Sequence, residues 1–154
     1  MGASFFQRGG AWVIGQMLLM GAVLALGGLF PGENFWRGSG LMGGIIMGIG
    51  GLTGLAGVAS LRSGLTPFPK PRDQSRLIQT GIYGLMRHPL YTSVIVTAVG
   101  WGLFRQSWLA LAAAGLLALF FDRKARHEEA YLRGQFAVYR EYERRVRRFI
   151  PFVY

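Results

Sequence analysis

Two long stretches of apolar residues in the first 61 positions predict membrane-spanning helices. Residues 11–30 and 40–61 carry no charged side chain, and each is close to the length of about 20 residues with which a helix crosses a bilayer. Turn formers and a charge at 31–34 (Pro-Gly-Glu-Asn) separate them. We therefore expect two spans that pack against each other as an antiparallel hairpin.

A second pair of apolar stretches follows at 89–104 and 108–121. Each is short for a full crossing, and Trp101 and Trp108 flank the polar break at 105–106, as tryptophans at a membrane interface do. We expect a tight helical hairpin over these residues, whose second helix can extend past the apolar stretch. A re-entrant pair that does not fully cross the bilayer is the alternative.

Between the two pairs, residues 62–88 are polar and basic, and three prolines in their first half exclude a regular helix there. After the second pair, residues 122–154 keep a helical pattern but become charged, with Leu132, Phe136 and Tyr139 on one face. This pattern indicates an amphipathic helix on the membrane surface. The expected fold is therefore a single-domain, all-α integral membrane protein with about four transmembrane helices, arranged as two hairpins, plus this C-terminal helix.

Glycines recur through the second span. Gly40, Gly44 and Gly48 fall on one stripe of a helix, and Gly50 and Gly54 form a second pair. Such small-residue steps let a neighbouring backbone approach closely. They serve an internal helix hairpin and a homodimer equally well, so the pattern leaves a homo-oligomer open.

Charge is distributed unevenly along the chain. Only 16% of the residues are charged, against about 25% in a soluble domain, and fourteen charged residues fall between 122 and 148. The net charge of +10 comes from basic residues that flank apolar segments, which favours anionic lipid headgroups over nucleic acid as partner. No cysteine is present, which excludes disulfides, thiolate metal sites and a cysteine nucleophile.

The basic residues also predict an orientation. With four spans, one side of the membrane holds the basic loop 62–88, the basic tail 122–154 and Arg8, whereas the other side holds only Arg37 and Arg105. The positive-inside rule assigns the richer side to the cytoplasm. We expect both termini, the middle loop and any active site near them on the cytoplasmic side.

The side chains best suited to chemistry gather at one membrane boundary. Arg87 and His88 directly precede Pro89, a residue that suits the first turn of a helix. Backbone N–H groups at such a helix start, with a guanidinium beside them, attract a carboxylate or phosphate. The alternative is a basic pair that merely flanks the membrane, with Tyr83 and Tyr91 as interfacial belt residues.

Two adjacent carboxylates, Glu128 and Glu129, follow the fourth apolar stretch. Carboxylates near the end of a span are costly unless they are solvated or paired. Taken alone, they indicate a solvated helix face, with Arg133 as a partner at helical spacing. No metal site is expected, because His88 and His127 lack the ligand spacing of a zinc site.

Together these residues resemble the signature of the isoprenylcysteine carboxyl methyltransferase and phospholipid methyltransferase superfamily of integral membrane enzymes. The string Gly-x-Tyr-x-x-x-Arg-His-Pro-x-Tyr occupies 81–91, and a helical hairpin and the pair Glu128–Glu129 follow it. A Leu-x-x-x-Phe-x-x-Tyr-x-x-Tyr segment at 132–142 comes next, and basic residues before Ile150–Pro151 close the pattern. The resemblance covers roughly residues 64–152, and the earlier residues match only as generic spans.

The resemblance implies a methyl transfer that depends on S-adenosylmethionine and takes a lipophilic small molecule or a lipidated acceptor. Because many relatives have further spans before the motif, neither the acceptor nor the choice of oxygen, nitrogen or sulfur transfers. The implied catalytic residues are Arg87, His88 and Glu128. The residues implied around the cofactor are Gly81, Tyr83, Arg87, His88, Pro89, Tyr91, Glu128 and Glu129.

Two other functions compete with this interpretation. A non-catalytic membrane scaffold or assembly partner would keep the helices but tolerate the loss of Arg87 and Glu128. A small transporter or channel would place ionisable residues near the bilayer midplane, and the four apolar stretches contain no Asp, Glu, Lys, Arg or His.

Overall fold

The computed structural model describes residues 9–32, 36–61 and 77–154, and the described residues form helices without a β-sheet. The all-α fold class is thereby confirmed. The first part of the expected basic loop, 62–76, lies outside the described residues. The elements are α1 (Gly10–Leu29), α2 (Ser39–Leu61), the 3₁₀ helix η2 (Gly81–Gly84), α3 (Pro89–Phe104), α4 (Trp108–Gln135) and α5 (Tyr139–Arg145).

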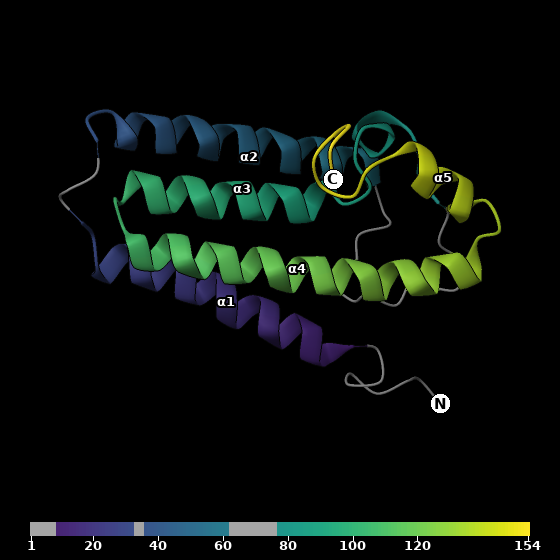
Figure 1. Ribbon diagram of the computed structural model, residues 1–154, viewed down its shortest axis with the longest axis horizontal. Helices are drawn as coiled ribbons and strands as arrows, with labels where there is room; N and C mark the ends of the chain where they lie inside the picture. Colours follow the sequence, from purple (N-terminus) through teal and green to yellow (C-terminus); the bar gives the residue numbers. More distant parts are fainter. Residues whose placement is uncertain (1–8, 33–35, 62–76) are drawn as a thin grey trace.

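The four long helices lie side by side as a bundle (Figure 1). α2 packs along α3, α3 packs on α4, and α1 packs mainly on α4. The expected hairpin between the first two spans is therefore wrong as a packing unit, because α3 and α4 lie between α1 and α2 (Figure 1). α2 packs on α3 instead, through a face on which several glycines are buried.

Glycine lets α2 and α3 come into backbone contact. Gly43, Gly50 and Gly57 are buried on one face of α2, and that face meets α3. On α3, a Cβ added at Gly100 would lie 2.7 Å from the backbone nitrogen of Met47 and 2.8 Å from the carbonyl oxygen of Gly43. Small residues allow this approach between membrane helices.

Only some of the glycines predicted to mediate helix packing lie at the contact between α2 and α3. A Cβ added at Gly44 or Gly48 would meet no atom within 4 Å, so their face of α2 is open. The second predicted pair, Gly50 and Gly54, does contact side chains of α3. Glycines occupy more than one face of α2, so four-residue spacing alone could not decide which face is buried.

The connection from α3 to α4 forms the expected tight helical hairpin. Ser107 caps α4 and accepts a hydrogen bond from the backbone N–H of Ala110 at 3.3 Å. Arg105 in the turn donates through Nε to the carbonyl oxygen of Gly27 at 3.0 Å. A cation there satisfies a terminal carbonyl of α1 and complements the helix dipole. The turn therefore also ties α1 to the hairpin.

α4 extends well beyond its apolar part. It continues as one helix to Gln135, and α5 begins after a break at Phe136, so the expected separate helix over 122–154 is wrong in its bounds. Leu132, Phe136 and Tyr139 still meet in one apolar cluster, as their spacing predicted. The helical pattern located the buried face but not the break within it.

The C-terminal segment returns to the start of α3. The backbone N–H of Arg87 donates to the carbonyl of Arg147 at 2.8 Å, and that of His88 donates to the carbonyl of Arg148 at 3.0 Å. The Thr92 hydroxyl adds a bond to the carbonyl of Phe149 at 3.1 Å. Two distant parts of the chain thus meet at the end of the bundle where α2 ends and α3 begins (Figure 1).

Two of the helices, α1 and α2, are long and apolar enough to cross a membrane. Large apolar side chains such as Leu18, Leu41 and Leu52 are exposed on their surfaces. Water penalises such surfaces and lipid does not. This fits the expected membrane protein, and a crossing by α3 and α4 stays a prediction.

The α2–α3 contact predicts opposite effects for two glycine substitutions. Gly100→Ala places a Cβ against backbone atoms of α2, so we expect the free energy of unfolding to fall by about 1–3 kcal/mol. Gly48→Ala meets open space and gains helix propensity, so stability should stay the same or rise by up to about 1 kcal/mol. Unfolding in mixed detergent micelles, followed by circular dichroism, measures both. Equal stability of the two variants would contradict the packing.

Candidate active site

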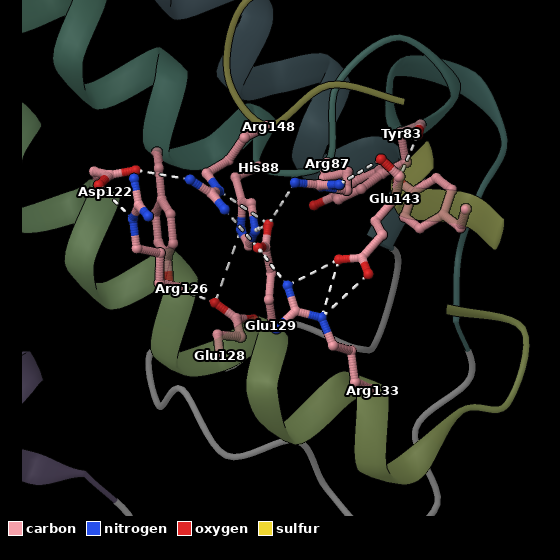
Figure 2. A network of polar contacts seen from close by, with 12 residues as sticks. Tyr83, Arg87, His88, Asp122, Arg126, Glu128, Glu129, Arg133, Glu143 and Arg148 are labelled. Carbon is pink, nitrogen blue, oxygen red and sulfur yellow. Dashed lines mark hydrogen bonds and ion pairs between the residues drawn. The ribbon is translucent and has the colours of Figure 1, made fainter. Parts of the chain in front are cut away.

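Arg87 and His88 are held between η2 and the start of α3. His88 is the N-cap residue of α3 and Pro89 is its first residue, as the sequence predicted. The bonds to the C-terminal segment fix the backbone of both residues. Their side chains are nearly buried, with 9% of Arg87 and 6% of His88 exposed. Both extend toward α4 (Figure 2).

The group that they meet is the carboxylate of Glu129, which is completely buried on α4. Arg87 Nη2 lies 2.9 Å from Glu129 Oε1, and His88 Nε2 lies 3.2 Å from the same oxygen. Arg148 donates through Nε to Oε1 at 3.1 Å and through Nη2 to Oε2 at 2.8 Å, which makes a bidentate pair. The solvated-face alternative is therefore wrong for Glu129, because three basic side chains from two distant parts of the chain enclose it (Figure 2).

These contacts keep Glu129 ionised. Burial alone would raise the pKa of this carboxyl, but hydrogen bonds from His88 and Arg148 and the charges of His88 and Arg87 outweigh burial and lower the pKa from 4.5 to about 2. The expected helical partner Arg133 lies farther away, at 3.7 Å. A buried charge of this kind is stable only while its partners remain in place.

The neighbouring carboxylate, Glu128, has a different environment. About a quarter of its side chain is exposed, and the Tyr91 hydroxyl donates to its Oε2 at 2.8 Å. The Tyr91 ring stacks on the His88 ring with 5.3 Å between the centroids and 3° between the planes. Glu129 thus holds the cluster together, whereas Glu128 stays partly exposed beside the rings of Tyr91 and His88.

Arg148 is a site residue that the sequence did not single out. It is one of several basic residues before Ile150–Pro151, and that position was its only signal. Besides Glu129, it contacts Asp122 through Nη1 at 2.9 Å. The Tyr154 hydroxyl donates to the same Asp122 oxygen at 2.9 Å. Arg148 therefore links the C-terminal segment to α4 at two points.

The other expected residues lie at the edge of this cluster. The carbonyl of Tyr83 accepts a hydrogen bond from the Tyr142 hydroxyl at 2.6 Å. Burial raises the pKa of Tyr142 to about 12, with the charge of Arg87 opposing this shift, so the phenol remains a donor. Gly81 has φ of 62°, and a Cβ there would lie 2.9 Å from Ser60 Oγ. A glycine at this position therefore lets the start of η2 lie close to the end of α2.

A small pocket of about 160 Å³ opens beside Arg87. The Nε atom of Arg87 is buried and lacks a hydrogen-bond partner among the described residues. A buried donor without a partner is costly, so an acceptor oxygen that reached Arg87 Nε would be stabilised. The described residues hold no group of three or more His, Asp or Glu side chains arranged for a metal ion. The pocket is lined by Arg87, Glu143, Arg147, Arg148, Val153 and Tyr154.

A family model described as phospholipid methyltransferase matches residues 39–138. The chain belongs to this family. The match covers more than half of the chain and contains the Arg87–His88 and Glu128–Glu129 pairs, which confirms the resemblance seen in the sequence. The matched region differs from the region 64–152 over which the sequence was expected to resemble the family. It begins earlier, because it includes α2, and it ends before α5. α1 and Arg148 lie outside the matched region.

Curated relatives align with this family member over about 80 residues. The chain is 39% identical over 83 residues to a probable protein-S-isoprenylcysteine O-methyltransferase of Oryza sativa, which covers 53% of this chain and 44% of the relative. It is 34% identical over 83 residues to the protein-S-isoprenylcysteine O-methyltransferase B of Arabidopsis thaliana (53% and 42%). It is 33% identical over 81 residues to the cobalt-zinc-cadmium resistance protein CzcN of Cupriavidus metallidurans (52% and 38%). The chain spans less than half the length of these relatives.

Removing the charge of Glu129 should destabilise the fold. Glu129→Gln keeps the shape but leaves Arg87 and Arg148 without their counter-charge, so we expect a loss of about 3–5 kcal/mol in the free energy of unfolding. The matched control is Glu141→Gln on α5, whose side chain is 71% exposed in its pair with Arg145, and which should leave stability unchanged. Circular dichroism of the detergent-solubilised protein measures both. Equal stability of the two variants would contradict the role of Glu129.

The lowered pKa of Glu129 predicts how stability depends on pH. The carboxyl is ionised in the folded state down to a pKa of about 2, against 4.5 when unfolded, so its contribution is fully present above pH 4.5 and is lost as pH falls toward 2. The stability difference between the wild type and Glu129→Gln should therefore be constant near neutral pH and shrink below pH 4.5. A difference that stays constant down to pH 2.5 would contradict this assignment.

Proposed function

We propose that this protein is an integral membrane methyltransferase that uses S-adenosylmethionine and methylates a lipophilic acceptor. The observation that best supports this proposal is a contact between two sequence motifs within the region matched by the family model. Arg87 and His88 contact Glu129. Tyr91 donates a hydrogen bond to Glu128. The family description names a phospholipid, and two relatives are named for an isoprenylcysteine. A lipid or a lipid-modified group is common to these names.

The residues present fit this cofactor. Arg87 lines the pocket and keeps a buried Nε without a hydrogen-bond partner among the described residues, so it suits a carboxylate. The partly exposed carboxylate of Glu128 suits an amino or hydroxyl donor, and the ring of Tyr83 suits a cation. Both faces of the Tyr91 ring are stacked, on His88 and on Phe121, so Tyr91 would act through its hydroxyl group. When bound, S-adenosylmethionine would supply an electrophilic methyl group. The proposed cofactor residues are those expected from the sequence, with Arg148 added.

The chain's own residues would act mainly by positioning. Glu129 holds Arg87, His88 and Arg148 in fixed directions, and preorganised groups of this kind lower a barrier by aligning the reactants. Glu128 and His88 are the groups that can hold a proton if the acceptor is an amine or a thiol. A carboxylate acceptor needs no base. Arg87, His88 and Glu128 are therefore the proposed catalytic residues.

The proposed membrane placement follows the bundle. α3 and the apolar part of α4 lie alongside α1 and α2 (Figure 1), so all four would share the bilayer. The site lies at the end of the bundle where α2 ends and α3 begins, and the basic residues around it favour the cytoplasmic side. An acceptor dissolved in the bilayer would then reach the site laterally between helices.

Binding of the demethylated product S-adenosylhomocysteine tests the cofactor site. We expect the full chain in detergent to bind it in calorimetry, and Glu128→Gln and Arg87→Lys to weaken binding by about tenfold or more, because each removes a directional contact to the ligand. Arg145→Lys on α5, a residue whose side chain is 63% exposed, is the matched control and should bind as the wild type does.

Transfer of a labelled methyl group from S-adenosylmethionine to a farnesylated cysteine derivative or to a phosphatidylethanolamine then identifies the acceptor. A well-folded protein that binds neither the donor nor its product would refute the enzyme and leave the membrane scaffold. Normal binding by Glu128→Gln and Arg87→Lys would refute the site.

A further inference from the structure

The pocket beside Arg87 is walled mainly by the C-terminal segment. Four of its six lining residues, Arg147, Arg148, Val153 and Tyr154, come from that segment. The pocket has a volume of about 160 Å³, whereas pockets that enclose a ligand of drug size have about 300–1,000 Å³. S-adenosylmethionine is a ligand of this size. The pocket therefore admits the proposed cofactor only if part of this wall moves.

Residues 150–154, called the flap, form a turn that is closed on itself. The backbone N–H of Ile150 donates to the carbonyl oxygen of Tyr154 at 2.7 Å. The N–H groups of Val153 and Tyr154 both donate to the carbonyl oxygen of Ile150 at 3.1 Å. These bonds lie within the flap, so they remain satisfied when it moves as one unit.

The base of the flap is fixed, whereas its tip is not packed. Phe149 is buried in the main apolar cluster, and its carbonyl oxygen accepts a hydrogen bond from the Thr92 hydroxyl at 3.1 Å. Its N–H joins the base to the flap through the Tyr154 carbonyl at 2.7 Å. Phe152 and Val153 are 86% and 72% exposed. Because a segment with few buried apolar contacts has a low local stability, the flap can turn about Phe149.

The Tyr154 side chain joins the flap to α4. Its hydroxyl donates to Asp122 Oδ1 at 2.9 Å and accepts from Arg126 Nη2 at 3.1 Å. Arg126 Nε also donates to Asp122 Oδ2 at 2.8 Å, and Arg148 Nη1 donates to Asp122 Oδ1 at 2.9 Å (Figure 2). These charged groups therefore keep one another as partners when Tyr154 leaves. The contact can break without leaving a buried charge unpaired.

We propose that the flap is a gate for S-adenosylmethionine. It swings about Phe149 to admit the cofactor and then closes over it, and the bond from the Tyr154 hydroxyl to Asp122 is the latch that holds it closed. This gate rests on the proposed function. Arg148 stays in place during the movement, because its bidentate pair with the buried carboxylate of Glu129 is stronger than the bonds of a phenol.

The movement separates two tasks of the C-terminal segment. Arg148 and the backbone bonds at Arg87 and His88 hold the binding groups in position whether the flap is open or closed. The flap alone controls access to the pocket. Once closed, it excludes water from the methyl group that is transferred, as loops that close over active sites do.

A fixed wall explains the flap less well. A permanent closure is stabilised by burying apolar side chains, because exposed polar contacts contribute little. The flap instead leaves Phe152 and Val153 exposed. It is joined to α4 through Asp122 and Arg126, whose side chains are 21% and 60% exposed. Contacts of this kind break and re-form readily.

Tyr154→Phe keeps the ring and removes the latch. Because a hydrogen bond to a charged group is lost, the open fraction should rise about tenfold in both the ligand-free and the bound protein. Association and dissociation of S-adenosylhomocysteine should therefore both become about tenfold faster, with unchanged affinity. Surface plasmon resonance on the full chain in detergent measures the two rates. Tyr131→Phe on α4, a residue that is 41% exposed, is the matched control and should keep the rates of the wild type.

The two rates together distinguish a gate from other roles of Tyr154. Rates that Tyr154→Phe leaves unchanged would show a fixed wall and overturn the proposal. A faster dissociation alone, with weaker affinity, would show that Tyr154 contacts the ligand directly, and it would overturn the gate as well.

A reversible cross-link tests the movement itself. The chain has no cysteine, so Tyr154→Cys and Arg126→Cys together can be joined specifically by a bis-methanethiosulfonate reagent as long as the two side chains that it replaces. Cross-linked protein should bind S-adenosylhomocysteine at least about tenfold more slowly than the same sample after reduction. Protein cross-linked after loading should retain the ligand until it is reduced. Binding and release at the same rates before and after reduction would contradict the gate.

The outcomes separate the gate from the proposed function. Binding of S-adenosylhomocysteine at rates that neither Tyr154→Phe nor the cross-link changes would refute the gate and leave the cofactor site standing. No binding of S-adenosylhomocysteine by the well-folded, reduced protein would refute the cofactor, and the gate with it.

Discussion

The rest of the site depends on one buried carboxylate. Glu129 has no exposed surface and is surrounded by Arg87, His88 and Arg148 at hydrogen-bonding distance. Each of these charged groups would be costly alone in the interior, and pairing lowers that cost for Glu129, Arg87 and Arg148. The arrangement fixes the directions of the groups that face the pocket. It also joins the start of α3, the extended part of α4 and the C-terminal segment into one unit.

The packing of the helices brings the groups around Glu129 together. α2 and α3 approach through glycines such as Gly43 and Gly100, and η2 packs beside α2 just before the Arg87–His88 pair. α4 is long enough to leave the apolar part of the bundle and carry Glu128 and Glu129 past the start of α3. α1 lies outside the matched family region, yet it reaches α4 and brings Gln16 to Lys124. The long helix α4 is therefore the element on which the cluster around Glu129 is built.

Much of this could be predicted from the sequence, and the errors have physical causes. Apolar stretches located all four long helices, and Pro89 marked the first residue of α3. The pairing of α1 with α2 was wrong because adjacency in sequence does not determine which surfaces fit, and the glycine face of α2 fits α3. The spacing of Leu132, Phe136 and Tyr139 correctly predicted that they pack together, but it did not predict the break between α4 and α5. Arg148 was missed because nothing local distinguishes it from the basic residues around it.

The sequence by itself determined the helical membrane character, the family and the two motifs, because hydrophobic length, proline position and ordered residue types are local properties of the chain. Only the tertiary structure decided that Glu129 is buried and Glu128 is partly open, although the two are neighbours on one helix. It also decided that Arg148 pairs with Glu129 and that Lys124 faces α1. These are contacts between distant segments, and their energies depend on burial and on charges that the folded chain alone brings together.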